Sequence, residues 1–247
     1  MTGFPGPVVA IHQPNYAPWI GWFVKAAAAD LFVLLDDVQF SKGSYTNRAR
    51  VSGPKGPSWL TVPVLHGGAA PIRETRIADR DWPRRHVAIL RDRFQGSPGL
   101  PAAEEVLREE GLSGREGLGE ANEVVLGRLR EALGLRRDWV RSSDLGVAAG
   151  DPTERLVAIC GRLGGRTYLS GKGGAAYHDE GRFREAGIAV AYHRFTHPVY
   201  PQPGPGFLEG MSTLDLLCGA GAKAGDLLAA AAASAVLEAG PTAGPSG

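Results

Sequence analysis

Cysteine and long apolar runs are both scarce in this sequence. Its two cysteines, Cys160 and Cys218, lie far apart, and neither belongs to a CxxC or Cys/His cluster with metal-ligand spacing. We therefore expect two reduced thiols that act as small buried hydrophobes, and no metal site. No run of about 18 apolar residues is found, and residues 1–11 lack the basic and apolar segments of a signal peptide. The expected location is the cytoplasm, without a membrane partner.

A strong net charge is also missing. The 247 residues include 27 basic and 26 acidic side chains, so the formal net charge is only +1. Because no global field would attract nucleic acid, we expect a small-molecule or protein-borne substrate and no nucleic-acid partner. The GxSxG, dinucleotide GxGxxG and P-loop motifs are absent too. Their absence argues against a serine hydrolase, a nicotinamide oxidoreductase and a P-loop kinase.

The apolar segments predict an α/β fold. Residues 8–13 and 31–37 are short apolar runs that end in polar residues, as buried parallel strands do, and residues 19–29 between them suit a helix. Two later runs, 166–171 and 188–195, flank a short helix near residues 179–186 in the same way. The sequence therefore predicts a mostly parallel, Rossmann-like sheet flanked by helices.

A helical insertion at about residues 82–135 interrupts this pattern, within a single α/β domain that we expect to span residues 1–239. Residues 40–57 contain too much Gly, Pro and Ser for a regular element and predict a functional loop. The tail at 240–247 is expected to be disordered. The remaining expectations are an antiparallel strand pair at 59–65 and 74–79, helices at 82–94, 101–110, 116–133 and 151–165, the last capped by Asp151, a strand at 138–145, and a long helix over 211–239.

Polar side chains follow the first predicted strand where it ends. His12, Gln13 and Asn15 lie there, and ligands of open α/β sheets bind at the carboxyl ends of parallel strands. A neutral imidazole at His12 can accept a proton, and the two amides can donate to a developing oxyanion. The alternative is a histidine that only hydrogen-bonds its own turn.

Two carboxylates, Asp36 and Asp37, end the second predicted strand. Such a pair could bind a divalent ion, fix an amine or orient His12. Alternatively, one aspartate caps the next element while the other pairs with a basic residue of the loop.

The predicted loop carries a local positive cluster in an otherwise neutral protein. Lys42, Arg48, Arg50 and Lys55 belong to it, and they suit a phosphate or carboxylate on the ligand. A solvated loop with scattered charge is the alternative.

Two later segments could border the same site. Residues 170–174 (SGKGG) follow a predicted strand, so their N–H groups could face an anion, although a tight glycine turn explains them almost as well. His193 and His197 belong to a strand-like segment before Pro198 and do not match a helical zinc site. His197 could still line the mouth of the site, together with Tyr200 and Gln202.

Several longer segments occur in order between about residues 8 and 221: HQPNYAPWIGWFVKAAAADLFVLLDDVQFSKGSYTNRARV, WLTVPV, YLSGKGGAAY, and HPVYPQ followed by STLDLL. Together they resemble the WbqC-like family. Members of this family occur in loci for O-antigen and other surface sugars and beside natural-product assembly genes. The resemblance therefore implies biosynthetic work on amino sugars or on carrier-bound acyl groups.

Carried over position by position, the resemblance implies two groups of site residues. At Gly43 and Tyr45 the sequence departs from the larger polar residue and the tryptophan that we expect there, which suggests a reshaped pocket. The candidate catalytic residues are His12, Gln13, Asn15, Asp36 and Asp37, and the candidate substrate-binding residues are Gln39, Lys42, Tyr45, Asn47, Arg48, Ser170, Gly171, Tyr177, His197, Tyr200 and Gln202.

Our first hypothesis is an amide-forming acyltransferase that takes its acyl or aminoacyl group from a thioester on coenzyme A or an acyl carrier protein. A thioester is already activated, so no cofactor beyond the donor's phosphopantetheine is required. His12 would be the general base, Gln13 or Asn15 an oxyanion donor, and Asp36 or Asp37 the anchor of the amine. The residue 42–55 loop would meet a phosphate of the donor.

Three other functions stay open from the sequence. LLDDVQ at a strand end loosely resembles the acidic metal motif of nucleotide-sugar glycosyltransferases, although that motif has a residue between its carboxylates. An N-terminal histidine loop between strand and helix also occurs in nucleotidylyl-transfer enzymes, but Asn15 stands where a second histidine would be expected. The third is a binding or scaffold protein, which the polar residues at strand ends disfavour.

Overall fold

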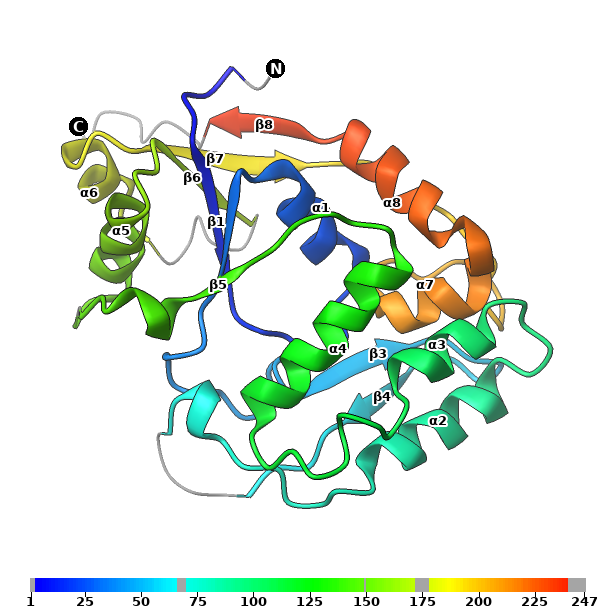
Figure 1. Cartoon of the computed structure of the whole chain (residues 1–247). Helices are drawn as coiled ribbons and strands as arrows, with labels where there is room; N and C mark the ends of the chain where they lie inside the picture. Colours follow the sequence, from blue (N-terminus) through cyan, green and yellow to red (C-terminus); the bar gives the residue numbers. More distant parts are fainter. Residues whose placement is uncertain (1–2, 66–69, 149, 172–177, 240–247) are drawn as a thin grey trace, which may run out of the picture.

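The computed structural model describes residues 3–65, 70–148, 150–171 and 178–239. Its main sheet has six strands in the order β5-β2-β1-β6-β7-β8 (Figure 1). Neighbouring strands are parallel except for β8, which runs antiparallel to β7. The mostly parallel α/β sheet predicted from the sequence is confirmed. The strands are β1 (Val8–His12), β2 (Leu31–Leu34), β5 (Val140–Arg141), β6 (Thr167–Ser170), β7 (Ala189–Arg194) and β8 (Val236–Ala239).

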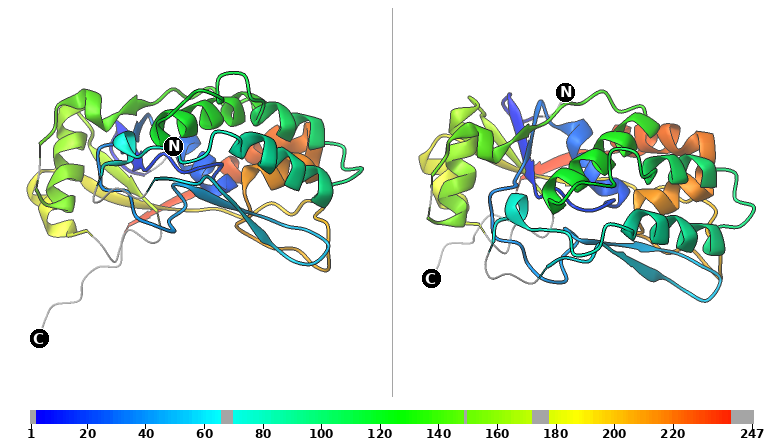
Figure 2. Two further views of the ribbon diagram at one scale, coloured as in Figure 1. Left: turned by 90° about the horizontal axis from the view of Figure 1, so that it is seen from below. Right: turned by 60° about the horizontal axis from the view of Figure 1, so that its bottom comes forward.

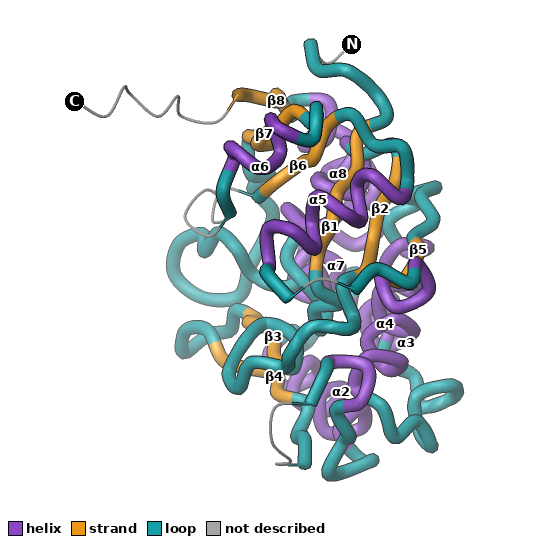
Figure 3. Tube along the Cα trace, turned by 90° about the vertical axis from the view of Figure 1, so that its left-hand side faces the viewer, coloured by secondary structure: helices purple, strands orange, loops and turns teal. Residues whose placement is uncertain are grey.

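Helices cover both faces of this sheet. Side chains alternate along β1, so that Val8 and Ala10 face one core while Val9 and Ile11 face the other. The second core is closed by α5 and α6, which lie on the near side of the strands in Figure 3, with α7 and α8 behind. The helices are α1 (Ile20–Ala28), α2 (Trp82–Arg93), α3 (Leu100–Val106), α4 (Leu118–Ala132), α5 (Pro152–Arg162), α6 (Glu180–Glu185), α7 (Thr213–Ala220) and α8 (Ala224–Ala233).

The predicted helices of the middle region are present as α2, α3 and α4. The start of α5 also matches its prediction, because the carboxylate of Asp151 accepts hydrogen bonds from the N–H groups of Thr153 and Glu154. Residues 138–145 form only the short β5, followed by the 3-10 helix η2 (Ser142–Leu145).

Two predictions for residues 40–79 are wrong. Residues 48–51 form a strand, β3 (Arg48–Val51), within the predicted loop, and this strand pairs antiparallel with β4 (Ser58–Thr61) in a separate ribbon (Figure 2). Residues 74–79 therefore do not form the strand partner. Residue 74 ends the 3-10 helix η1 (Ile72–Glu74), and the residues after it keep two isolated antiparallel bridges, Val64 with Ile77 and Arg76 with Gly117.

The predicted helix over residues 211–239 is also partly wrong. A 3-10 turn, η4 (Gly221–Lys223), separates α7 from α8, and the chain ends the described region as β8 on the edge of β7. The Thr213–Ala233 stretch is long and apolar enough to cross a membrane by length and composition alone. It packs against α3 and α1 instead, as core helices of a soluble-type α/β fold do. The predicted disordered tail lies outside the described residues.

Candidate functional site

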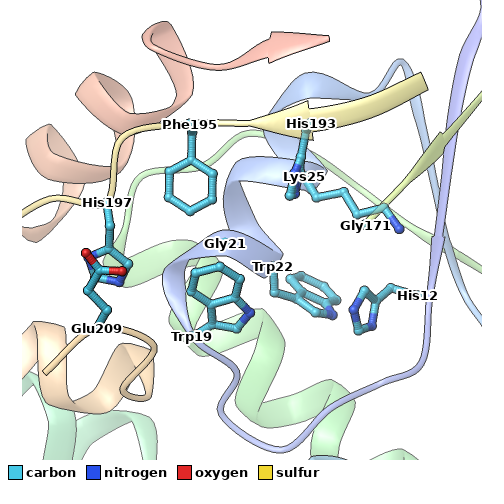
Figure 4. A pocket seen from close by; sticks show the side chains of 10 residues that line it. All are labelled: His12, Trp19, Gly21, Trp22, Lys25, Gly171, His193, Phe195, His197 and Glu209. Carbon is cyan, nitrogen blue, oxygen red and sulfur yellow. The ribbon is translucent and has the colours of Figure 1, made fainter. Parts of the chain in front are cut away.

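The carboxyl ends of β1 and β7 border a cavity of about 310 Å³, here called the first cavity (Figure 4). In the sheet, β2 pairs with one edge of β1 and β6 pairs with the other. The chain segments that follow these strands therefore leave the sheet in opposite directions at the carboxyl end of β1. Such a switch point is where open α/β sheets bind ligands. His12 follows Ala10 in the alternation of β1, and His193 follows Ala191 in β7. Both imidazoles therefore face α1 and the first cavity.

Lys25 reaches this cavity from α1. Its side chain is buried, and its Nζ donates a hydrogen bond of 2.8 Å to the carbonyl of Ile11, the residue before His12. Burial in apolar surroundings disfavours the charged ammonium and lowers the pKa of Lys25 to about 7. An amine with such a pKa is divided between its charged and neutral forms at neutral pH.

His12 is a neutral imidazole whose tautomer is fixed. Its Nδ1 lies 3.1 Å from the carbonyl oxygen of Gln13, and because that oxygen can only accept, Nδ1 carries the proton. Burial, followed by the charge of Lys25, lowers the pKa of His12 to about 3. Its Nε2 is therefore a lone-pair acceptor at neutral pH.

Trp19 separates the first cavity from a second one. The second cavity has a volume of about 330 Å³, and His12 and Trp19 line both. The indole of Trp19 stacks on the His197 ring, with centroids 6.0 Å apart and planes at 13°. His197 is itself held, because its Nδ1 contacts the Pro198 carbonyl at 2.9 Å and its Nε2 accepts from the N–H of Gly210 at 3.3 Å.

The second cavity carries an amide and a cation. Asn15 and Arg50 both line it, together with Tyr45 at its exposed side. The guanidinium of Arg50 lies 5.7 Å from the ring centroid of Trp59, while that of Arg48 lies closer, at 4.2 Å. Arg50 is thus the member of the predicted basic cluster that lines the second cavity.

One side chain of α4 bridges two loops beside the second cavity. Asn122 of α4 donates through Nδ2 to the carbonyls of Pro14 and Thr46, both at 2.7 Å. The hydroxyl of Thr46 in turn donates to Oε1 of Gln13 at 3.1 Å. Gln13 consequently supports the wall behind His12 through its side chain rather than lining a cavity.

The structure brings five of the predicted site residues to the two cavities and places the others elsewhere. These five are His12, Asn15, Tyr45, Gly171 and His197. Two of the others, Gln39 and Lys42, line a separate cavity. Asn47 donates to the Val62 carbonyl, and the Ser170 hydroxyl donates to the carbonyl of Gly171. Tyr177 lies outside the described residues.

Asp36 and Asp37 do not join His12. Asp36 accepts from the N–H and hydroxyl of Ser143, at 3.1 and 2.8 Å, which caps the short helix η2. Asp37 accepts from the hydroxyl of Ser142 and forms an ion pair with Arg155 at 2.9 Å. Their oxygens connect β2 to η2 and α5, and neither carboxylate lines the first or the second cavity. The prediction that this pair anchors an amine beside His12 is therefore corrected.

Tyr200 and Gln202 likewise point to the protein interior. Nε2 of Gln202 donates to the carboxylate of Asp215 and to the carbonyl of Leu208, both at 3.0 Å. Asp215 also accepts from the N–H of Ser52. Burial raises the pKa of the buried Tyr200 phenol, and the charge of Asp215 raises it further. This cluster joins the 200–208 segment to α7 and lines neither cavity.

Sequence reasoning missed Lys25, Glu209 and the wall formed by His193 and Phe195. For Lys25 a signal existed, because it is the one charged residue in the apolar helix α1. For His193 and Phe195 no local signal existed, since β1, β6 and β7 bring residues from opposite halves of the chain to one cavity. Glu209 lies in a segment without regular structure, which gives no pattern to interpret. Within the described residues, no group of three or more His, Cys, Asp and Glu side chains could hold a metal ion.

Comparisons with known proteins match most of the chain. The model of the WbqC-like protein family matches residues 13–226. An uncharacterized protein of Mycobacterium tuberculosis (strain ATCC 25618 / H37Rv), Rv1507c, is 34% identical over 224 residues, which cover 89% of this chain and 96% of that protein. The family match includes most residues that line the two cavities.

Proposed function

The chain belongs to the WbqC-like protein family, and we propose that it is an amide-forming acyltransferase that moves an acyl or aminoacyl group from a thioester to an amine. The observation that carries the proposal is the pair of cavities that share His12 and Trp19. Two substrates can each occupy one cavity and meet at the imidazole. Such an arrangement supplies the proximity that a bimolecular transfer needs.

In this mechanism the amine occupies the first cavity and the thioester the second. The amine nitrogen attacks the thioester carbonyl carbon, a C–N bond forms, and the carbonyl oxygen becomes an oxyanion. Nε2 of His12 accepts the proton from the attacking nitrogen and returns it to the sulfur as the C–S bond breaks. The products are an amide and a free thiol.

Residues of the second cavity would stabilise the donor. The Asn15 side chain forms no hydrogen bond with another described residue, so its amide can donate to the oxyanion. Arg50, on the wall of the same cavity, suits a phosphate of coenzyme A or of a carrier protein's phosphopantetheine. The Ser212 hydroxyl on this wall already donates to the Ala17 carbonyl at 2.6 Å, which favours direct transfer without an acyl-enzyme.

The setting we propose is biosynthesis in the cytoplasm, on amino sugars or natural-product intermediates. Two features support it. The α/β fold is of the soluble type, and the two cysteines are free and buried, as they are in reducing compartments. An acyl carrier protein would be the partner when the thioester is protein-borne.

The test is to incubate the protein with acyl thioesters of coenzyme A and of an acyl carrier protein, together with a panel of amines. We expect free thiol and amide in equal amounts, measured by a thiol reagent and by mass spectrometry. His12→Asn should lower kcat by about 10²- to 10⁴-fold, and Asn15→Ala by about 10²-fold. Arg50→Ala should raise the KM for the donor.

Arg184→Ala, which removes an exposed arginine of α6, is the matched control for Arg50 and should change neither constant. Thermal unfolding of each variant establishes that it is folded. Thiol release without amide, or a His12→Asn variant with the wild-type rate, would contradict the proposed mechanism.

A further inference from the structure

Lys25 is a buried amine whose charged form has no counter-ion among the described residues. Its residue is 3% exposed, and within the described residues its ammonium has the Ile11 carbonyl as its hydrogen-bond acceptor and forms no ion pair. Removing an ammonium from water is costly unless a negative charge compensates it. A carbonyl oxygen supplies only part of that compensation.

The groups around Lys25 do not supply the missing charge. Among the residues that the structure describes, none of the titratable side chains that interact with Lys25 is a carboxylate. They come from β1, α5, β6 and the segment before α6, and they are His12, Cys160, Tyr168 and His178. His193 of β7 lines the same cavity. Burial raises the pKa of the Cys160 thiol to about 12, so the thiol stays uncharged at neutral pH. The inner end of the first cavity is therefore positive or neutral, but not negative.

The other end of the same cavity differs. Glu209, an exposed carboxylate, lies beside His197 and apart from Lys25 (Figure 4). Between the two ends the walls are aromatic, formed by Trp19, Trp22 and Phe195. A ligand in this cavity thus meets a cation at one end and apolar surface along its body.

We propose that the first cavity binds a small ligand through a carboxylate that pairs with Lys25, with the body of the ligand against Trp19 and Phe195. In the proposed function, on which this part rests, the acceptor is then an amino acid or another small amine that also carries a carboxylate. A carboxylate fits better than a phosphate. One lysine beside the neutral imidazole of His12 balances a single negative charge and leaves a dianion undercompensated.

Protonation should be linked to binding of the carboxylate. At pH 8 the free protein holds Lys25 mostly neutral, because burial lowers its pKa to about 7. A bound carboxylate favours the ammonium, so the complex takes up close to one proton. His12 stays neutral at this pH in both states, since its pKa is far lower.

The experiment uses the full chain and three matched probes with one phenyl ring: phenylalanine, 3-phenylpropanoate and phenethylamine. Binding is followed by tryptophan fluorescence, to which Trp19 and Trp22 of the cavity wall contribute, and by titration calorimetry at pH 8 in two buffers of different ionisation enthalpy. We expect phenylalanine and 3-phenylpropanoate to bind with proton uptake, and phenethylamine and inorganic phosphate to bind more weakly. Lys25→Met should raise the Kd of 3-phenylpropanoate by about tenfold or more.

Lys223→Met, at an exposed site in η4, is the matched control and should leave binding unchanged. Proton uptake in the wild type gives a second readout that does not depend on how well Lys25→Met folds. The inference is overturned if 3-phenylpropanoate fails to bind up to about 10 mM, if phenethylamine or phosphate binds as tightly, or if no proton is taken up.

These outcomes separate the inference from the proposed function, because binding is measured without a thioester. Amide formation with carboxylate-free amines, and no binding of 3-phenylpropanoate, would overturn the carboxylate site alone. Carboxylate binding without any amide product would overturn the acyltransferase alone.

Discussion

The indole ring of Trp19 lies against Gly21 in a space that only glycine leaves open. A β-carbon added at Gly21 would overlap the six-membered ring of Trp19, and Trp19 is the wall shared by both cavities. Glycine weakens a helix, so α1 itself does not require it in its first turn. The position of the Trp19 indole in the cavity wall does require it.

Gly21→Ala should displace Trp19 and change both cavities while the fold persists. We expect altered tryptophan fluorescence and at least about tenfold weaker binding of the phenyl probes, the scale of one lost aromatic wall. Gly127→Ala in α4, where a β-carbon meets open space, is the matched control. It should stabilise the protein by up to about 1 kcal/mol. Wild-type probe binding by Gly21→Ala would show that Trp19 can move without consequence.

His86 should make the fold sensitive to mild acid. This buried imidazole lies 2.8 Å from the Tyr16 hydroxyl and 3.1 Å from the Thr61 carbonyl. Burial lowers its pKa from 6.5 to about 4. Because the unfolded chain binds the proton more tightly, stability is lost as the pH falls through this interval.

From pH 7 to pH 5 the contribution of His86 to the free energy of unfolding should fall by about 2 kcal/mol. Urea unfolding at the two pH values measures it. His86→Gln keeps a donor and an acceptor but cannot titrate, so its stability should depend less on pH. An identical pH dependence in wild type and His86→Gln would assign the acid sensitivity to other groups.

Asp215 and Gln202 should affect stability rather than chemistry. Asp215→Ala removes the acceptor of the Ser52 N–H and one of the two acceptors of the Gln202 amide, so we expect the free energy of unfolding, measured with urea, to fall by about 3 kcal/mol. Gln202→Ala should lose less, about 1 kcal/mol, and a folded sample should keep the wild-type affinity for the phenyl probes. If Gln202→Ala lost probe binding while its stability stayed unchanged, Gln202 would bind the ligand, as the sequence predicts.

Asp37 should behave in the same way. Asp37→Asn breaks the largely buried ion pair with Arg155, and we expect a cost of about 1 to 3 kcal/mol without loss of amide formation. Asp144→Asn, at an exposed position in η2, should change stability by less than about 0.5 kcal/mol. If Asp37→Asn abolishes turnover in a protein of normal stability, a role of the carboxylate pair in chemistry regains support.

Local patterns were sufficient to predict most of the elements. The apolar runs around α1 and the Asp151 cap depend on residues close in sequence, and such signals need no tertiary information. β3 was missed because Gly, Pro and basic residues surround it. Its own alternation, with Ala49 and Val51 buried beside less buried arginines, is that of a half-buried strand. β8 was missed because an alanine-rich run favours helix, whereas pairing with β7 decides its conformation.

The site was harder to predict than the fold. His12 and Asn15 could be found because strand ends carry ligand sites in this architecture. The role of Asp36 could not, since Ser142 and Ser143 lie more than one hundred positions further along the chain. Lys25 looked like the single charge of an apolar helix. Only the packing of α1 against the sheet places its ammonium next to His12.

The two hydrogen bonds from Asn122 have a consequence for protein engineering. Because one amide holds the main-chain carbonyls of both Pro14 and Thr46, a graft that shifts the backbone of the HQPN turn or of the segment before β3 leaves this buried amide without one of its acceptors. A loop graft intended to change ligand preference should therefore preserve both backbone paths, or transfer both segments together with the α4 position that joins them. A graft of one segment with a different backbone path should yield a poorly ordered chimera, whatever the quality of the transplanted side chains.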